Sequence, residues 1–342
     1  MDSTVKKNRT RIEYIWLDGG ESLPKLRSKT RFVDSEDCKD KIPDWNFDGG
    51  STEQGSLKNS DRCLRGVRAY KDPFVEGGFL AFCEVLYHNG THHETNTRHH
   101  LSQLVEEVGE GILVGFEQEF TFVNTADLQP LGLLLSPEKQ GQYYCGVGCM
   151  NAIGRFIVDE FEHACSKAGL ELDGLNAEVM PGQWEFQTKA QDPLKSSDDL
   201  WVARYIMERV AEAKPVIVSY DPKPHPDFNG AACHTNISTE SMRTKFEDSD
   251  ISDLMAHIKM DHEEHMKVCG EGYERRMTGE CEAPDHSKFT WGYSDRGASI
   301  RIPEKVKRDG AGYIEDRRPC SNIDPYKVLY SLVSSIKESN EL

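Results

Sequence analysis

The sequence predicts an α+β fold in two parts, with a small β-rich part over residues 11–95 and a larger part over residues 96–342. Two apolar runs, Ile12–Leu17 and Phe79–Tyr87, predict strands in the first part. Leucines and valines at helical spacing over residues 97–108 predict a helix just after the boundary. Beyond that helix the chain alternates between helical and strand patterns.

Three further helices are predicted in the second part, over residues 153–168, 197–212 and 251–268. The last of them carries His262 and His265, three residues apart. No group of carboxylates accompanies this pair, so a polar helix face explains it better than a metal site.

The segment Val114–Val123 alternates with period two, which predicts a strand. Three phenylalanines face one side of it, and Glu117 and Glu119 face the other. Two carboxylates on one face repel each other, and a core strand tolerates them poorly unless a cation lies between them. The alternative is the solvated face of an edge strand.

A second pair of carboxylates flanks the turn signal Pro181-Gly182. If the chain folds back symmetrically there, Glu178 lies directly opposite Glu185, with Cβ atoms roughly 5 Å apart. A surface hairpin is the alternative, but Trp184 beside Glu185 favours burial. Four carboxylates in two strands predict a site for a hard cation with oxygen ligands, Mg²⁺ or Mn²⁺.

Composition excludes several classes of partner. The formal net charge of -17 over 342 residues argues against nucleic acid and acidic membrane surfaces. Ten cysteines without a Cys-x-x-Cys pair indicate reduced thiols and a cytoplasmic location. The N-terminus is polar, with no signal peptide expected, and no apolar run is long enough to span a membrane.

The C-terminal third contains a group of arginines: Arg275, Arg276, Arg296, Arg301, Arg317 and Arg318. Arginine forks bind phosphate and carboxylate oxygens in a bidentate manner. Surface ion pairing accounts for Arg275 and Arg318. The chain has no glycine-rich phosphate loop, so phosphates would be bound by metals and arginines. His234 is a candidate metal ligand through a neutral nitrogen, with a core histidine as the alternative.

These segments together resemble the glutamine synthetase family of the eukaryotic type. The resemblance runs from about residue 12 to residue 330, and its most specific pieces are Asn176–Gln187, Asn229–Asn236, Ser299–Pro303 and Gly312–Pro319. It implies a β-grasp domain over residues 11–95 and a catalytic domain with a curved antiparallel sheet and flanking helices over residues 96–342. It also implies stacked rings, with a decamer expected, whose active sites lie between subunits.

The resemblance implies an ATP-dependent condensation of L-glutamate and ammonia to L-glutamine through γ-glutamyl phosphate. It implies two cation sites, held by Glu119, Glu178 and Glu185 and by Glu117, His234 and Glu315. Glutamate would be bound by Asn229, Gly230, Arg276, Arg296 and Arg317. ATP would be bound by Glu117, Glu185, Asn236, Ser238, Arg296, Arg301 and Tyr313.

Three residues have implied catalytic roles: Asp48, Glu282 and Arg296. Asp48 would bind ammonium at a neighbouring subunit's site, and Glu282 would close over glutamate on a flap. The chain departs from the family at Gly50 and at Glu280, Cys281 and Ala283 of that flap. Two alternatives therefore remain: a family member that ligates another amine to glutamate, and a ring-forming paralogue with weak or no catalysis.

Overall fold

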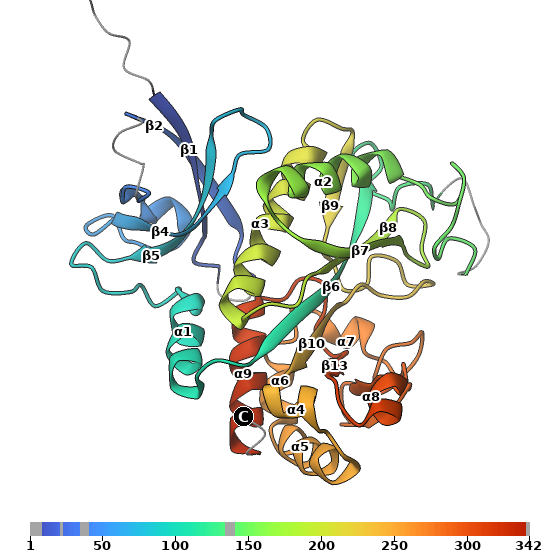
Figure 1. Cartoon of the computed structure of the whole chain (residues 1–342). Helices are drawn as coiled ribbons and strands as arrows, with labels where there is room; N and C mark the ends of the chain where they lie inside the picture. The colour runs from blue at the N-terminus through green and yellow to red at the C-terminus, as the bar shows by residue number, and fades with distance from the viewer. Residues whose placement is uncertain (1–8, 21–22, 35–40, 134–140, 340–342) are drawn as a thin grey trace, which may run out of the picture. The chain divides into compact units, whose positions relative to one another are not determined.

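The computed structural model describes residues 9–20, 23–34, 41–133 and 141–339 (Figure 1). The chain divides into two compact units, one formed by residues 1–99 with 163–170 and the other by the remainder. Among the described residues, no helix has both the length and the apolar character needed to cross a membrane.

The first unit contains a five-stranded sheet in the order β2-β1-β5-β4-β3. Its strands are β1 (Arg9–Leu17), β2 (Leu26–Asp34), β3 (Trp45–Asp48), β4 (Asp61–Lys71) and β5 (Phe79–Leu86). β1 runs parallel to β5, and the other neighbours are antiparallel. The core takes Ile12, Tyr14 and Trp16 from β1, together with Phe47 and Leu64. The two strands predicted in this region are confirmed.

The second unit contains an eight-stranded sheet in the order β11-β12-β13-β10-β6-β8-β7, with β9 also paired to β6. Its strands are β6 (Leu113–Asn124), β7 (Leu172–Ala177), β8 (Gln183–Thr188), β9 (Val216–Ser219), β10 (Cys233–Ser238), β11 (Trp291–Tyr293), β12 (Ile300–Ile302) and β13 (Ile314–Asp316). All pairs are antiparallel except β11 with β12. β6 is therefore an interior strand, which excludes the edge-strand alternative for Glu117 and Glu119.

The helices are α1 (Thr97–Val108), α2 (Arg155–Ala168), α3 (Pro193–Ala211), α4 (Glu240–Thr244), α5 (Asp248–Met260), α6 (His262–Met266), α7 (Tyr273–Arg276), α8 (Glu304–Asp309) and α9 (Pro325–Glu338). α3 packs on β6, β8 and β9, and α9 packs against α3, α5 and α6 (Figure 1). α3 begins before the predicted residue 197. The Asp192 carboxylate accepts a hydrogen bond from the Lys195 N–H, and Pro193 takes the first helical position.

The helix predicted over residues 251–268 is in fact two helices, α5 and α6, divided at Asp261. The Asp261 carboxylate accepts a 2.6 Å hydrogen bond from the Ser335 hydroxyl of α9. His262 and His265 are both buried, so the prediction of a polar helix face is wrong. Their imidazoles contact the Arg318 guanidinium instead.

Arg318 is 0% exposed, so its interpretation as a surface ion pair is wrong. Its Nε and Nη2 donate to the two carboxylate oxygens of Asp316 at 2.9 and 2.7 Å. Burial raises the pKa of Asp316, but the charge and hydrogen bonds of Arg318 outweigh burial and hold that pKa below its usual value. Arg275 does form the expected exposed pair, 3.0 Å from Asp221.

Breaking the buried pair should destabilise the fold. We expect Asp316→Asn to lower the free energy of unfolding by about 3–5 kcal/mol, because it leaves the Arg318 charge buried without a counterion. The exposed pair provides the control, and Arg275→Met should cost less than about 1 kcal/mol. Urea denaturation measures both changes. Equal and small losses in the two variants would contradict the assigned burial.

Candidate active site

The central strand β6 places two carboxylates on one face of the sheet. Glu117 pairs with His234 of β10, and Glu119 pairs with Glu185 of β8. Because side chains directly opposite each other share a face, all four lie on the same side. Glu119 and Glu185 are buried there, as the strand pattern predicts.

The predicted opposition of Glu178 and Glu185 is wrong. Asn176 lies opposite Glu185, and the Glu178 N–H donates to the Gln183 carbonyl across a four-residue turn. Gly182 has a φ of 73° in that turn. A Pro-Gly pair does not form the tight turn that the symmetric register needs. The observed pairing of β7 with β8 is displaced by two residues from the predicted pairing. Because side chains alternate between the two faces of a strand, a displacement by an even number leaves Glu178 on the predicted face.

A cavity of about 570 Å³ in the second unit brings most of the predicted site residues together. All six predicted cation ligands line it: Glu117, Glu119, Glu178, Glu185, His234 and Glu315. The other predicted residues on its wall are Asn229, Gly230, Arg276, Glu282, Arg296, Arg301 and Arg317. Segments that lie far apart in the sequence therefore meet at one concave site.

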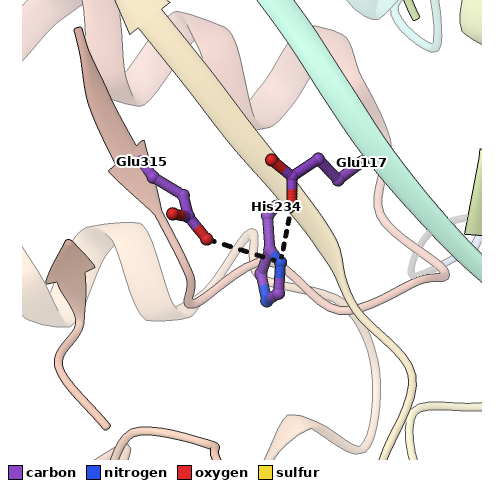
Figure 2. A group of neighbouring side chains, drawn as sticks. All are labelled: Glu117, His234 and Glu315. Carbon is purple, nitrogen blue, oxygen red and sulfur yellow. Dashed lines mark hydrogen bonds and ion pairs between the residues drawn. The ribbon is translucent and has the colours of Figure 1, made fainter. Parts of the chain in front are cut away.

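Within the described part of the chain, Glu117, His234 and Glu315 form a close group of potential ligands, with ligand atoms all within 4.8 Å of one another. Figure 2 shows both carboxylates turned toward His234, whose Nδ1 lies 3.4 Å from Glu117 and 3.7 Å from Glu315. Burial, followed by the charge of Arg317, holds the pKa of His234 well below its usual value. The imidazole is therefore neutral and able to coordinate a metal.

Glu119, Glu178 and Glu185 form a second acidic group on the same wall. Burial raises the pKa of each to about 8, and the next largest cause in each case is the charge of another member of the group. Three buried carboxylates with raised pKa values indicate that protons occupy this group when no cation is bound.

Side-chain amides hold these carboxylates, and these amides were not predicted from the sequence. Gln183 donates to Glu119 at 3.1 Å, Asn176 donates to Glu178 at 2.9 Å, and Gln187 donates to Glu185. All three amides follow the same period-two alternation as the carboxylates. Extending that alternation along both strands would have identified them.

Arginines balance the charge of Glu315. Arg301 and Arg317 each donate to its carboxylate at 2.5 Å. Arg317 also donates to the carbonyls of Arg296 at 3.0 Å and of Glu282 at 3.2 Å, so it connects Glu315 to the flap. A carboxylate with two arginine partners is compensated within the protein itself.

The flap segment has a strained backbone. Cys281 and Glu282 both adopt left-handed conformations, with φ of 55° and 59°. Side chains other than glycine adopt these only at a cost. The Glu282 carboxylate lies 3.8 Å from the Arg296 guanidinium. Cys281 and Ala283 also line the cavity, so two of the departures from the family pattern face the site directly.

Three predicted ATP-site residues are not among the described residues that line the cavity. Asn236 donates to Glu117 at 2.8 Å, and the Ser238 hydroxyl accepts from Arg243 at 2.9 Å. Tyr313 is 39% exposed. Asp48 lies in the first unit, where its carboxylate accepts hydrogen bonds from the Gly50 N–H and the Ser51 hydroxyl.

The donor set fits divalent cations that prefer oxygen. The cavity offers five carboxylates and one neutral imidazole, and no thiolate, among the predicted ligands. Oxygen donors with one imidazole suit Mg²⁺ and Mn²⁺. A cation bound at Glu119, Glu178 and Glu185 would replace the protons that these side chains otherwise hold.

Comparisons with known proteins identify the family of this chain. A family profile described as "Glutamine synthetase, catalytic domain" matches residues 94–337. Glutamine synthetase cytosolic isozyme 1-1 of Oryza sativa subsp. japonica is 43% identical over 324 residues, covering 92% of this chain and 90% of the relative. A glutamine synthetase of Streptomyces viridochromogenes is 44% identical over 332 residues, covering 95% of this chain and 96% of the relative.

A solved structure shows the same fold. The cryo-EM structure of Plasmodium falciparum glutamine synthetase superposes with a TM-score of 0.77 at 16% identity, covering 96% of this chain and 72% of that chain. The mixed α and β architecture with a curled, mostly antiparallel sheet agrees with that fold. The profile match and the two relatives extend over most of the chain, and the chain therefore belongs to the glutamine synthetase family, the glutamate–ammonia ligases.

Proposed function

We propose that the cavity of this glutamate–ammonia ligase binds two divalent cations, ATP and L-glutamate, and joins glutamate to ammonia through γ-glutamyl phosphate. One observation carries the proposal. Six potential cation ligands and four arginines line the same cavity of about 570 Å³. Bound Mg²⁺ or Mn²⁺ would supply positive charge to the phosphates of ATP. The arginines would orient the transferring phosphoryl group and its acceptor.

The glutamate substrate is proposed to bind in the part of the cavity lined by Asn229, Gly230 and Arg276. Arg276 is buried, and its guanidinium is fixed by the backbone carbonyls of Arg317 and Arg318 at 3.0 and 3.1 Å. A Cβ at Gly230 would meet the Arg276 side chain at 2.6 Å, so only glycine lets this backbone approach so closely. The fixed guanidinium and the close backbone approach support the proposal that Arg276 and Gly230 bind a carboxylate group of glutamate.

Phosphate binding is proposed for Arg296 and Arg301. The Arg296 side chain is more than half exposed at the cavity wall, where incoming oxygens can reach it. Arg301 is held by Glu315, which orients its fork next to the Glu117 and His234 group. Asn236, Ser238 and Tyr313 are proposed to complete the ATP site on the basis of the family resemblance alone.

Water must be excluded from γ-glutamyl phosphate, because water hydrolyses an acyl phosphate. We assign this exclusion to the flap that carries Glu282, whose backbone carbonyl is held by Arg317. Asp48 and Glu282 are proposed to bind ammonium and remove a proton before nitrogen attacks the acyl phosphate. Asp48 would act at a neighbouring subunit's site within a stacked-ring decamer.

The division of the chain into two domains is proposed from the same family resemblance. Residues 11–95 are proposed as a β-grasp domain and residues 96–342 as the catalytic domain. A cytoplasmic location is proposed as well, since the relatives from Oryza sativa and Vitis vinifera are named cytosolic isozymes.

Glu119→Gln should abolish glutamine formation and leave the protein folded. The substitution removes a cation ligand, and it also relieves repulsion with Glu178, so the cation-free protein should not lose stability. Glutamine formation from glutamate, ammonium, ATP and Mg²⁺, together with a melting curve, measures both effects. Glu171→Gln, which removes an exposed partner of Lys189, is the control and should keep activity. Near wild-type turnover in Glu119→Gln would contradict the assignment.

Divalent cations should stabilise the protein more at high pH than at low pH. The unfolded chain loses the protons of these glutamates near their ordinary pKa of 4.5, and the folded acidic group holds them until about pH 8. The cation-free protein therefore loses stability as pH rises across that window. A cation replaces those protons, so the Tm rise on adding Mg²⁺ should be larger at pH 8.5 than at pH 6.

Melting curves with chelator and with Mg²⁺, at constant ionic strength, test this dependence. A Tm rise of equal size at both pH values would show that proton release is not linked to cation binding.

A further inference from the structure

Arg204 of α3 is a buried arginine that does not line the catalytic cavity. It is 3% exposed, and it forms no salt bridge among the described residues. Its Nε and Nη2 both donate to the Gln118 side-chain oxygen, at 2.8 and 2.5 Å. Its remaining hydrogen bonds go to the backbone carbonyls of Ser321 at 3.0 Å and Ile323 at 2.8 Å.

Two aromatic rings complete the surroundings of this guanidinium. Its central carbon lies 4.6 Å from the ring centroid of Trp201 and 5.3 Å from that of Tyr220. Cation–π contacts offset part of the cost of burying the charge. An apolar side chain would still fill this space at lower cost, so the groups that Arg204 holds explain its presence better than stability does.

Gln118 lies on β6 between the two proposed cation ligands of that strand, Glu117 and Glu119. Because Arg204 occupies its oxygen, the side-chain amide can present only its nitrogen in the other direction. That nitrogen donates to the Glu119 carbonyl at 2.7 Å and to the Ser321 carbonyl at 3.0 Å. Arg204 therefore fixes the Gln118 amide, and this amide in turn fixes the backbone carbonyl of Glu119.

The same network returns to Glu119 along a second path. The Ser321 N–H donates to the Ala231 carbonyl at 3.1 Å. The next residue, Ala232, donates its N–H to the Glu119 carboxylate at 3.0 Å. Glu119 is therefore held at its backbone and at its carboxylate by two segments that both connect to Arg204.

We propose that Arg204 is a positioning residue for the cation site, acting through Gln118 and Ser321 to fix the direction of the Glu119 carboxylate. The inference rests on the proposed cation role of Glu119. A cation site binds well only when its ligands are held close to the required geometry. Loss of groups that orient metal ligands typically weakens metal binding 10–100-fold.

Two variants test the proposal, with Mn²⁺ alone as the probe. Arg204→Lys keeps the charge but loses the fork, because a single nitrogen cannot replace three. Gln118→Glu keeps the acceptor for Arg204 and supplies a counterion for it, but loses the donor to the Glu119 carbonyl. Each should raise the Kd for Mn²⁺ about tenfold, measured calorimetrically at a temperature at which the protein is fully folded.

Two controls on the same helix separate positioning from loss of stability. Val202→Ala removes buried volume from α3, and Arg209→Lys makes the same exchange at an arginine that contacts Tyr205 and Glu212. Both should keep the wild-type Kd. A wild-type Kd in either folded test variant, or an equal weakening in Val202→Ala, would overturn the proposal. If Glu119→Gln also leaves the Kd unchanged, the cation role itself fails.

Discussion

Repulsion among four buried carboxylates is the constraint that organises the catalytic unit. Glu119, Glu178, Glu185 and Glu315 are all buried at one cavity. The structure meets their charges in two ways. Glu315 receives two arginine forks and is compensated within the protein. The other three receive mainly neutral amides, and their raised pKa values mark where positive charge is missing. A cation proposed at Glu119, Glu178 and Glu185 would therefore compensate more uncompensated charge than one at Glu315.

The antiparallel sheet makes this crowding possible. β6 pairs with three strands along its length, so residues distant in sequence are brought opposite Glu117 and Glu119. The reverse face supplies rigidity, with Arg204 behind β6 and the Arg318–Asp316 pair behind β13. Neither Arg204 nor Arg318 lines the cavity. Backbone carbonyls hold the guanidinium of Arg204, and the Asp316 carboxylate holds that of Arg318. A mobile support would let the repelling carboxylates move apart.

Local pattern was sufficient to predict the strand faces, helix α1 and the grouping of Glu117, Glu119, Glu178 and Glu185. The addition of His234 and Glu315 to that group came from the family resemblance. Local pattern was insufficient where a distant partner contacts the element, as Ser335 of another helix does at Asp261. The hairpin register was missed for a local reason, because the turn has four residues and the symmetric register assumed two. The burial of Arg318 was also missed, although its carboxylate partner Asp316 stands only two residues away in the sequence.

Counting bound cations tests the central claim most directly. A titration of the folded protein with Mn²⁺ should give two sites per chain. Glu185→Gln should lose one of them, because Glu185 belongs to the group that accepts no arginine hydrogen bond within the described part of the chain. The site at Glu117, His234 and Glu315 should remain in that variant. A wild-type protein that binds no Mn²⁺, or a Glu185→Gln protein that binds the same number as wild type, would contradict the account.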